Sequence, residues 1–559
     1  MTALWRAALA LGCLVVVRMA TAADLPSGPL VTAEWLRQAL DRPDLVVLDA
    51  SPPPLAAQGR IPGAIAVNVF NMRAQSAAQL QERLRAWGIG ARSIVVVTDQ
   101  GGSYLGPRLH FDLAYAGFPE ARLFVLNGGM ARWRAIGGPV STAAPAAKAQ
   151  GDFAVRERPA LRASLADTLV ASGDRAGHAL IDALDLDYFY GGARFFDRQG
   201  HLPNAIALPA EDLFNADKTF KSPQEIRALL GFLGIRPDQQ VITYCGGGVA
   251  AAGPYFAIRH LAGFDRVKLY LGSQLEWVRD ERGLPLWTDA RPALRRSIAW
   301  LNGWNQSMLR QFGVAGLSVV DVRPRAAYDA GHIPFALHVP ATALREHMHD
   351  RQRLAELLGA AGVNPSDEAV IVGERGLDAD VALAWRLLTE LGQARVSFLD
   401  ASLEEWAMQG APLTRVPTEV GAAPGRDRFV VPAVTYRATS LNPASTTVST
   451  AAGKHAEATA APAAAHSGAW PRIVWHAGAA QASVASPAAA TAGAVVLPVQ
   501  QLVGADGRLG SAHALWTRLA KAGLPRYAEV TIEAADPGER AQALLVLQLL
   551  GHPAARTAP

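Results

Sequence analysis

One cysteine in the chain stands in a setting that favours nucleophilic chemistry. Cys245 directly follows the apolar run of residues 241–244. The loop after it comprises Gly246, Gly247, Gly248, Val249 and Ala250. Three consecutive residues without a Cβ let a loop curl and point its backbone N–H groups at the sulfur. We expect a helix to begin near Ala250, and its positive end would stabilise a thiolate. The pattern predicts a catalytic thiolate at Cys245.

A loop of this kind could also belong to a cysteine-dependent phosphatase or arsenate reductase. Those enzymes need an arginine six residues after the cysteine, because a bidentate guanidinium must hold the oxyanion. The residue at that position is Ala251, and the next arginine is Arg259. Phosphatase chemistry is therefore disfavoured.

The other cysteine, Cys13, lies in an N-terminal segment that resembles a signal peptide. Arg6 precedes a short apolar stretch, and small residues end at Ala22, after which we expect cleavage. Apolar residues continue beyond Cys13, which disfavours a lipoprotein cut there. The apolar stretch is too short to span a bilayer. The interpretation is a signal peptide at 1–22 and a periplasmic or secreted protein without stable membrane insertion.

Composition narrows the function further. The chain has 559 residues, with 53 Lys and Arg against 49 Asp and Glu, a net charge of +4 that is too balanced to indicate a nucleic-acid-binding surface. Two cysteines cannot form a disulfide framework or a four-cysteine zinc site. No metal-ligand cluster or phosphate loop stands out, so we expect neither metal nor cofactor.

Three stretches of the chain repeat the same order of features. Residues 59–64, 200–205 and 331–336 read Gly-Arg-Ile-Pro-Gly-Ala, Gly-His-Leu-Pro-Asn-Ala and Gly-His-Ile-Pro-Phe-Ala. Each follows an apolar run that ends in aspartate, and each is followed by a second apolar run, a helical stretch and a third strand pattern before a tryptophan. The aspartates are Asp49, Asp182 and Asp321, and the tryptophans are Trp133, Trp277 and Trp406.

Strands that alternate with helices predict an α/β fold with mostly parallel sheets flanked by helices. We expect domains at 28–142, 158–288 and 296–416, a low-complexity linker at 437–469, and a possible degenerate fourth domain at 470–556. The fourth has Ala534 where the cysteine would stand, and we expect no closing strand in it. In such sheets, reactive groups lie at the carboxyl ends of strands. That junction holds Asp99 in the first domain, Cys245 in the second and Glu374 in the third.

The ordered features together resemble the rhodanese-like sulfurtransferases. The resemblance implies that the first and third domains are inactive and that the second is catalytic. It implies a sulfurtransferase, exported if the signal peptide is present as expected, in which Cys245 takes a sulfane sulfur from a small donor of the 3-mercaptopyruvate or thiosulfate class. The resulting persulfide would pass that sulfur to a small thiol, cyanide or a protein thiol. The alternative is a non-catalytic repeat scaffold or binding protein in which Cys245 is vestigial.

The uncharged loop is similar to those of 3-mercaptopyruvate sulfurtransferases, with departures. Gly247 stands where that type has a serine, Arg60 stands at the position of its histidine, and Leu184 stands at the position of its substrate-binding arginine. A longer insert between Asp182 and Gly200 contains Arg194 and Arg198, either of which could replace the missing cation. The alternative is that both are solvated loop arginines. Arg60 is a further candidate substrate-binding residue.

Two residues of the second domain are candidates for a supporting role. His201 is expected to bond to backbone within its turn rather than transfer protons, and Asp182 is expected to order the turn at its strand end. Arg323 of the third domain occupies the family's substrate-arginine position in a copy without a nucleophile, which suggests a relic or an anion-binding role.

Overall fold

The computed structural model describes residues 25–72, 76–311, 316–421, 429–437, 470–478 and 493–558. The expected signal peptide and all of the expected linker except Arg437 lie outside these residues. The chain divides into two compact units, the first comprising residues up to Pro159 together with Phe214–Phe220 and the second comprising the rest. No helix within the described ranges is both long and apolar enough to cross a membrane.

The first unit contains a five-stranded parallel sheet in the order β1-β5-β4-β2-β3. Its two central strands are buried along their whole length, as strands covered by helices on both faces must be. The strands are β1 (Leu30–Val31), β2 (Leu45–Asp49), β3 (Ile65–Ala66), β4 (Ile94–Thr98) and β5 (Leu123–Leu126). The helices are α1 (Ala33–Ala39), α2 (Pro53–Ala56), α3 (Ala77–Ala86), α4 (Leu105–Tyr115) and α5 (Gly129–Ala135).

The second domain repeats this topology with the order β6-β10-β9-β7-β8. Ser164 and Ser222 begin two of its helices with capping boxes, in which side chain and backbone exchange hydrogen bonds. The strands are β6 (Arg162–Ala163), β7 (His178–Asp182), β8 (Ile206–Ala207), β9 (Gln240–Tyr244) and β10 (Val267–Tyr270). The helices are α6 (Leu165–Gly173), α7 (Leu186–Phe189), α8 (Pro223–Phe232), α9 (Ala252–Phe256) and α10 (Ser273–Arg279).

The third domain has the same arrangement again, in the order β11-β15-β14-β12-β13. The strands are β11 (Arg295–Arg296), β12 (Leu317–Asp321), β13 (Ala336–His338), β14 (Glu368–Val372) and β15 (Arg395–Leu399). The helices are α11 (Ile298–Asn305), α12 (Met308–Gln311), α13 (Arg325–Ala330), α14 (Ala341–His347), α15 (Arg351–Ala360), α16 (Ala379–Glu390) and α17 (Leu403–Met408). A separate two-stranded sheet pairs β16 (Glu419–Val420) with β17 (Val430–Val431).

The C-terminal region forms a four-stranded parallel sheet in the order β19-β18-β20-β21. This is the order of the other three sheets without their first strand, so the region is compatible with a degenerate fourth domain. The expectation that it lacks a closing strand was wrong, because β21 pairs in parallel with β20. That strand is short and contains an arginine, so its sequence carries no apolar run. The elements are β18 (Arg472–His476), β19 (Ala494–Val496), α19 (Ala512–Lys521), β20 (Glu529–Glu533), α20 (Pro537–Leu549) and β21 (Ala555–Thr557).

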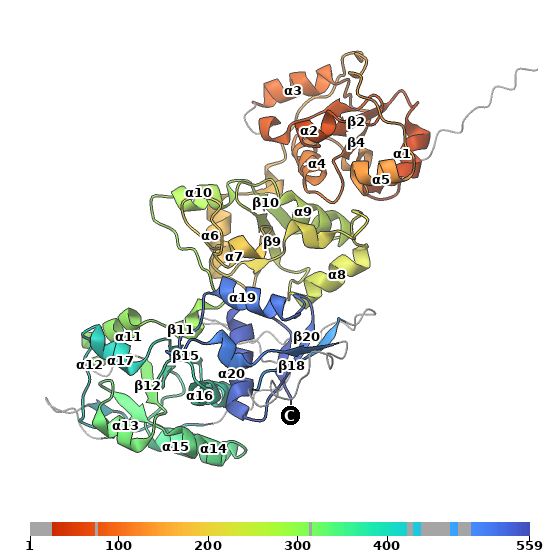
Figure 1. The fold of residues 1–559 in the computed structure, drawn as a ribbon. Coiled ribbons are helices and arrows are strands. Elements are labelled where there is room, and N and C mark those ends of the chain that lie inside the picture. The colour runs from red at the N-terminus through yellow and green to blue at the C-terminus, as the bar shows by residue number, and fades with distance from the viewer. Residues whose placement is uncertain are drawn as a thin grey trace, which may run out of the picture. The chain divides into compact units, whose positions relative to one another are not determined.

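The third and fourth domains share a core, because α16 packs along α20 (Figure 1). Both helices are apolar on several sides, which is the pattern of a helix buried within a larger assembly. The Gln542 amide also donates a hydrogen bond to the carbonyl oxygen of Leu377 at 2.9 Å. The region after the linker is therefore a folded part of the second unit.

The repeated tryptophans are core residues. Trp133, Trp277 and Trp406 are at most 1% exposed. Each donates its indole N–H to a proline carbonyl oxygen six or eight residues later, at 2.9 Å in all three domains. A buried indole needs such an acceptor, so this tryptophan locks the chain that leaves each domain.

Candidate active site

The loop after β9 brings a backbone N–H group to the sulfur of Cys245. The Gly248 N–H donates a hydrogen bond to the Sγ atom of Cys245 at 3.0 Å. Gly248 has a φ of +80°, and a Cβ at this position would lie 2.4 Å from the carbonyl oxygen of Leu271. Only glycine fits both the left-handed backbone and the close approach. The loop can therefore stabilise negative charge on sulfur without any charged side chain.

The first turn of α10 holds the Cys245 loop in place. The Cys245 N–H donates to the Ser273 Oγ atom at 3.1 Å, and that hydroxyl donates to the carbonyl oxygen of Tyr270 at 2.8 Å. The N–H groups of Gln274 and Leu275 donate to the carbonyl oxygens of Cys245 and Gly246, each at 3.0 Å. Ser273 was not among the residues expected at the site, although it lies between the third strand pattern of its repeat and Trp277.

The helix after the loop begins later than its sequence predicts. α9 starts at Ala252 rather than near Ala250, and it continues as a π-helical turn over Ala257–Leu261. Pro254 lies in its first turn, where a missing N–H costs nothing. Val249 and Ala250 are therefore part of the loop, and both residues are buried.

Asp182 lies at the end of β7, beside β9, and is fully buried. Its Oδ1 atom accepts the Leu184 N–H at 3.0 Å, the turn geometry that also occurs at Asp49 and Asp321. Burial raises the pKa of Asp182 to about 7, although hydrogen bonds from the Leu184 N–H and the Tyr244 hydroxyl lower it in part. The carboxyl group is turned toward the backbone of its own strand end.

His201 is also bound to backbone. Its ring stacks on Phe189 with the centroids 3.6 Å apart, and its Nδ1 atom is 2.7 Å from the Phe189 carbonyl oxygen. Burial lowers the pKa of His201 to about 4, so the imidazole is neutral at pH 7. His332 occupies the same position in the third domain, stacked on Tyr328 with its Nδ1 atom 2.9 Å from a carbonyl oxygen. The geometry is that of a residue holding a turn.

The insert between Asp182 and Gly200 brings an aromatic side chain to the Cys245 loop. Arg194 is exposed, whereas Arg198 is half-buried with an Nη2 atom that meets no hydrogen-bond partner among the described residues. The residue that packs on the loop is Phe195, because a Cβ at Gly246 would lie 2.5 Å from the Phe195 Cδ1 and Cε1 atoms. No charge or spacing pattern in the sequence marks this phenylalanine.

Arg60 lies in the first unit, where it ties the chain that leaves the domain. Its backbone pairs with Ser141 in both directions at 2.9 Å, and its Nη2 atom donates to the Ala143 carbonyl oxygen at 3.4 Å. Its Nε atom is buried without a hydrogen-bond partner among the described residues.

The rhodanese-like domain family matches this chain three times, at residues 32–136, 165–280 and 302–409. Together these matches cover more than half of the chain. The chain belongs to the rhodanese-like family.

Relatives of the chain carry sulfurtransferase names. It is 31% identical to a probable 3-mercaptopyruvate sulfurtransferase of Pseudomonas aeruginosa, over 46% of this chain and 98% of the relative. It is 28% identical to the sulfur carrier protein TtuD of Thermus thermophilus, over 44% of this chain and 93% of the relative. Among solved structures, it is similar to SseA from Escherichia coli, a 3-mercaptopyruvate sulfotransferase with the rhodanese fold. That similarity has a TM-score of 0.40 and 25% identity over 44% of this chain and 99% of the other. The named relatives support sulfur transfer as the general activity of the family members.

The first rhodanese-like domain fills its loop with a carboxylate. The Asp99 Oδ1 and Oδ2 atoms accept the N–H groups of Gly101 and Gly106, both at 2.8 Å. Burial raises the pKa of Asp99 to about 6. The Asp99 carboxylate thus accepts backbone N–H groups of its own loop and of α4 at the position that Cys245 occupies in the second domain.

The third rhodanese-like domain closes the equivalent position with an ion pair. The Arg323 guanidinium makes bidentate contact with Asp321 and also donates to the carbonyl oxygen of Gly331, while its Nη1 atom lies 3.5 Å from the Glu374 Oε2 atom. The fourth domain covers the same loop, because the Leu377 N–H donates to the Gly507 carbonyl oxygen at 2.9 Å. The fourth domain itself has Ala534 directly after β20. None of these positions in the described chain carries a nucleophile.

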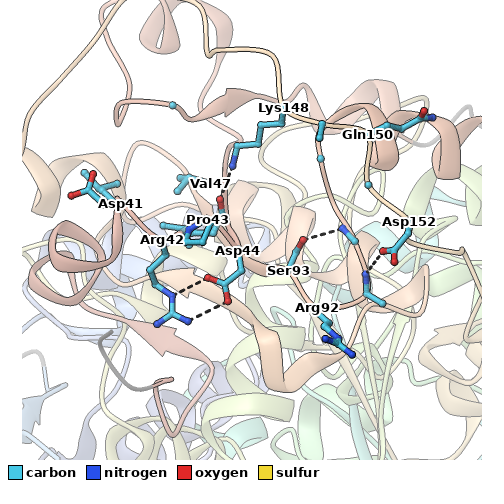
Figure 2. Close-up of a pocket in the computed structure, with 18 of the residues that line it drawn as sticks. Asp41, Arg42, Pro43, Asp44, Val47, Arg92, Ser93, Lys148, Gln150 and Asp152 are labelled. Carbon is cyan, nitrogen blue, oxygen red and sulfur yellow. Dashed lines mark hydrogen bonds and ion pairs between the residues drawn. The ribbon is translucent and has the colours of Figure 1, made fainter. Parts of the chain in front are cut away.

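A shallow cavity of about 950 Å³ lies in the first domain, away from its cysteine-equivalent loop. Figure 2 shows the Lys148 side chain reaching toward β2, where its Nζ atom donates to the Leu45 carbonyl oxygen at 2.6 Å. Leu45 and Ser93 lie at the amino ends of β2 and β4, so the cavity is at the opposite edge of the sheet from Asp99. It contains none of the residues predicted for the site.

Proposed function

We propose that the protein is a sulfurtransferase that carries a sulfane sulfur as a persulfide on Cys245. The supporting observation is the hydrogen bond from the Gly248 N–H to the Cys245 Sγ atom, in a loop shaped by a left-handed glycine. A backbone donor at Sγ stabilises the thiolate before it attacks the donor and again when it leaves as the acceptor takes the outer sulfur. Asp99, Glu374 and Ala534 replace the cysteine in the other copies, which leaves one reaction centre.

The proposed reaction has two nucleophilic steps. With thiosulfate, the Cys245 thiolate attacks the outer sulfur, the donor S–S bond breaks and sulfite leaves with the electron pair. With 3-mercaptopyruvate, the thiolate takes the donor sulfur, the C–S bond breaks and the electron pair leaves on carbon, which is protonated to give pyruvate. An acceptor thiolate or cyanide then attacks the outer persulfide sulfur, and the Cys245 thiolate leaves. Because the two substrates react in turn, the kinetics should be ping-pong.

We propose 3-mercaptopyruvate as the donor class, with thiosulfate as the second candidate. The Cys245 loop has no charged side chain to meet a dianion. A carboxylate donor needs one cation near the sulfur, and we assign this role to Arg198, which is half-buried and has an Nη2 atom without a hydrogen-bond partner among the described residues. We also propose export after cleavage behind Ala22, which would make a small thiol or a protein thiol outside the cytoplasm the acceptor.

Mass spectrometry of the Cys245 peptide tests this function. Incubation with 3-mercaptopyruvate or thiosulfate should add about 32 Da, the mass of one sulfur atom, and a thiol or cyanide should remove it. Cys245→Ser is the control for assignment of the added mass. A peptide that gains no mass with either donor, in a protein that remains folded, would favour the alternative of a repeat scaffold with a vestigial cysteine.

A further inference from the structure

Cys245 is almost fully buried, although the reaction proposed for it needs access to its sulfur. Only 2% of the residue is exposed, yet a donor sulfur and then an acceptor must each reach the Sγ atom. In-line attack requires reacting atoms about 3–3.5 Å apart along an open approach. Some part of the surrounding structure must therefore move between the resting state and each reactive complex.

Phe195 is the side chain whose position matches that requirement. Its ring lies directly against the backbone of Gly246, the residue next to the nucleophile, and any Cβ there would meet the ring at 2.5 Å. At the same time, 47% of Phe195 is exposed. The ring therefore lies between the Cys245 loop and solvent, with one part packed on the loop and the other part in water.

The segment that carries Phe195 is held by few contacts of its own. Its ring meets Tyr188 edge-on with the centroids 5.6 Å apart and Phe196 with the centroids 4.9 Å apart. The Ala193 N–H donates to the Asp187 carbonyl oxygen at 2.9 Å, which closes the turn after α7. Residues 191–199 contain no helix or strand. A half-exposed ring on an irregular segment is the kind of element that opens locally at low free-energy cost.

The base of this segment rests on the fourth domain. The Tyr190 hydroxyl donates to the carbonyl oxygen of Leu550 at 2.8 Å in a buried position. The His513 ring occupies the space that a side chain at Gly192 would need, with its Nδ1 atom 2.2 Å from an ideal Cβ there. The same Nδ1 atom lies 3.4 Å from the Asp187 Oδ1 atom. Three residues at the base of the segment thus contact the C-terminal region of the second unit.

We propose that Phe195 is a specificity-determining cover over Cys245 and that the fourth domain sets its position through Tyr190, Gly192 and His513. This inference rests on the proposed sulfur transfer and deepens it, because it assigns the control of access to one side chain and gives the C-terminal domain a role. The cover restricts bulky reactants more than small ones, since a large reagent needs a wider opening than a small donor does.

Alkylation of the Cys245 thiol tests the cover without requiring any sulfur transfer. The folded full chain is treated with iodoacetamide and, separately, with a maleimide carrying a polyethylene glycol chain, and the Cys245 peptide is quantified over time. If access requires opening, the observed rate is the intrinsic rate multiplied by the open fraction. We expect Phe195→Ala to increase the iodoacetamide rate about tenfold and the rate with the larger reagent by more than that.

Two matched variants separate a cover from a general loss of stability. Trp304→Ala removes an aromatic that is 43% exposed in the third domain and should leave the rate unchanged. His513→Ala should raise the rate, whereas His476→Ala should not, although His476 also lies 3.4 Å from a carboxylate in the fourth domain. Phe195→Leu serves as a second variant if the alanine protein does not fold. Each variant is compared at equal free energy of unfolding, as measured by urea denaturation.

The outcomes distinguish this inference from the proposed function. Faster alkylation in Phe195→Ala and His513→Ala supports the cover. If no donor yields a persulfide in the same proteins, that result contradicts the proposed function but leaves the cover supported. Persulfide formation with an alkylation rate that Phe195→Ala leaves unchanged would overturn the cover. Equal acceleration with both reagents would overturn its size selectivity, and equal rates in His513→Ala and His476→Ala would overturn the role of the fourth domain.

Discussion

The Arg323 Nη1 atom lies 3.5 Å from the Glu374 Oε2 atom, so the third domain joins its substrate-arginine position to its cysteine position by an ion pair. The two partners differ in environment, because the Arg323 side chain is 6% exposed and the Glu374 side chain is 61% exposed. The principal partner of Arg323 is instead Asp321, which is fully buried. Arg323 is thus fixed mainly by Asp321, and Glu374 is the weaker, solvent-exposed partner.

Loss of Arg323 should destabilise the third domain strongly. Arg323→Ala leaves the Asp321 carboxylate buried without its cation, which typically costs about 3–5 kcal/mol. Glu374→Gln should cost less than about 0.5 kcal/mol, because the carboxylate is largely solvated. Hydrogen exchange of β12 and β14 amides measures the stability of this domain separately from the others. Similar protection in the two variants would contradict the assignment of Asp321 as the main partner.

The buried Asp182 predicts a pH-dependent stability. Its pKa is about 7 in the folded protein against 3.8 for an ordinary aspartate, because burial penalises the charged form. The folded state therefore binds a proton that the unfolded state has released, and stability falls as pH rises from about 4 to about 7. The loss is on the order of a few kcal/mol at neutral pH.

Asp182→Asn should remove this dependence, because an amide does not titrate and its oxygen can still accept the Leu184 N–H. The measurement is the urea midpoint of both proteins between pH 4.5 and 7.5. The midpoint of the variant should rise relative to that of the native protein as pH rises. A constant difference over that range would show that Asp182 ionises normally.

The repeats made the fold predictable, whereas contacts between distant segments did not follow from them. Apolar runs ending in aspartate at Asp49, Asp182 and Asp321 recur with a buried tryptophan, and this order is enough to predict three parallel sheets. The short strand β21 escaped prediction because three residues with an exposed arginine have no periodic pattern. Its place is set by pairing with β20, which is a tertiary effect.

The sequence predicted only the part of the site that local sequence controls. Three glycines after Cys245 indicate an amide-lined loop, because local sequence controls backbone freedom. Phe195 and Ser273 could not be identified in this way, since their contacts with the loop cross 51 and 28 residues of chain. The helix start near Ala250 was placed two residues early, which is the usual uncertainty of a boundary without a capping side chain.

Ser273 should act as a positioning residue for Cys245. Ser273→Ala removes the acceptor of the Cys245 N–H and leaves that donor buried, at a cost of about 1–3 kcal/mol. We expect slower persulfide formation with an unchanged rate order among donors, because the loop loses its support but no group that contacts the donor. Ser172→Ala is the control, since its hydroxyl donates to the Leu169 carbonyl oxygen at the end of α6. The two variants are compared by the rate of mass gain at Cys245, and equal rates would show that Ser273 does not position the loop.

Gly248 should be the position in the loop that tolerates substitution least. Gly248→Ala places a methyl group 2.4 Å from the Leu271 carbonyl oxygen and strains a backbone at φ +80°, so the N–H that meets the Cys245 sulfur must move. Gly234→Ala is a matched control in the same domain, because Gly234 has a φ of +73° with nothing within 4 Å of a Cβ. Both variants carry the left-handed strain, about 1–2 kcal/mol, but only Gly248→Ala adds the collision with backbone.

We expect persulfide formation to fall at least about 100-fold in Gly248→Ala, as for the loss of an oxyanion donor, and to stay near the native rate in Gly234→Ala. The measurement is the rate of mass gain at the Cys245 peptide. A similar rate in both variants would mean that the Gly248 amide does not stabilise the reacting sulfur.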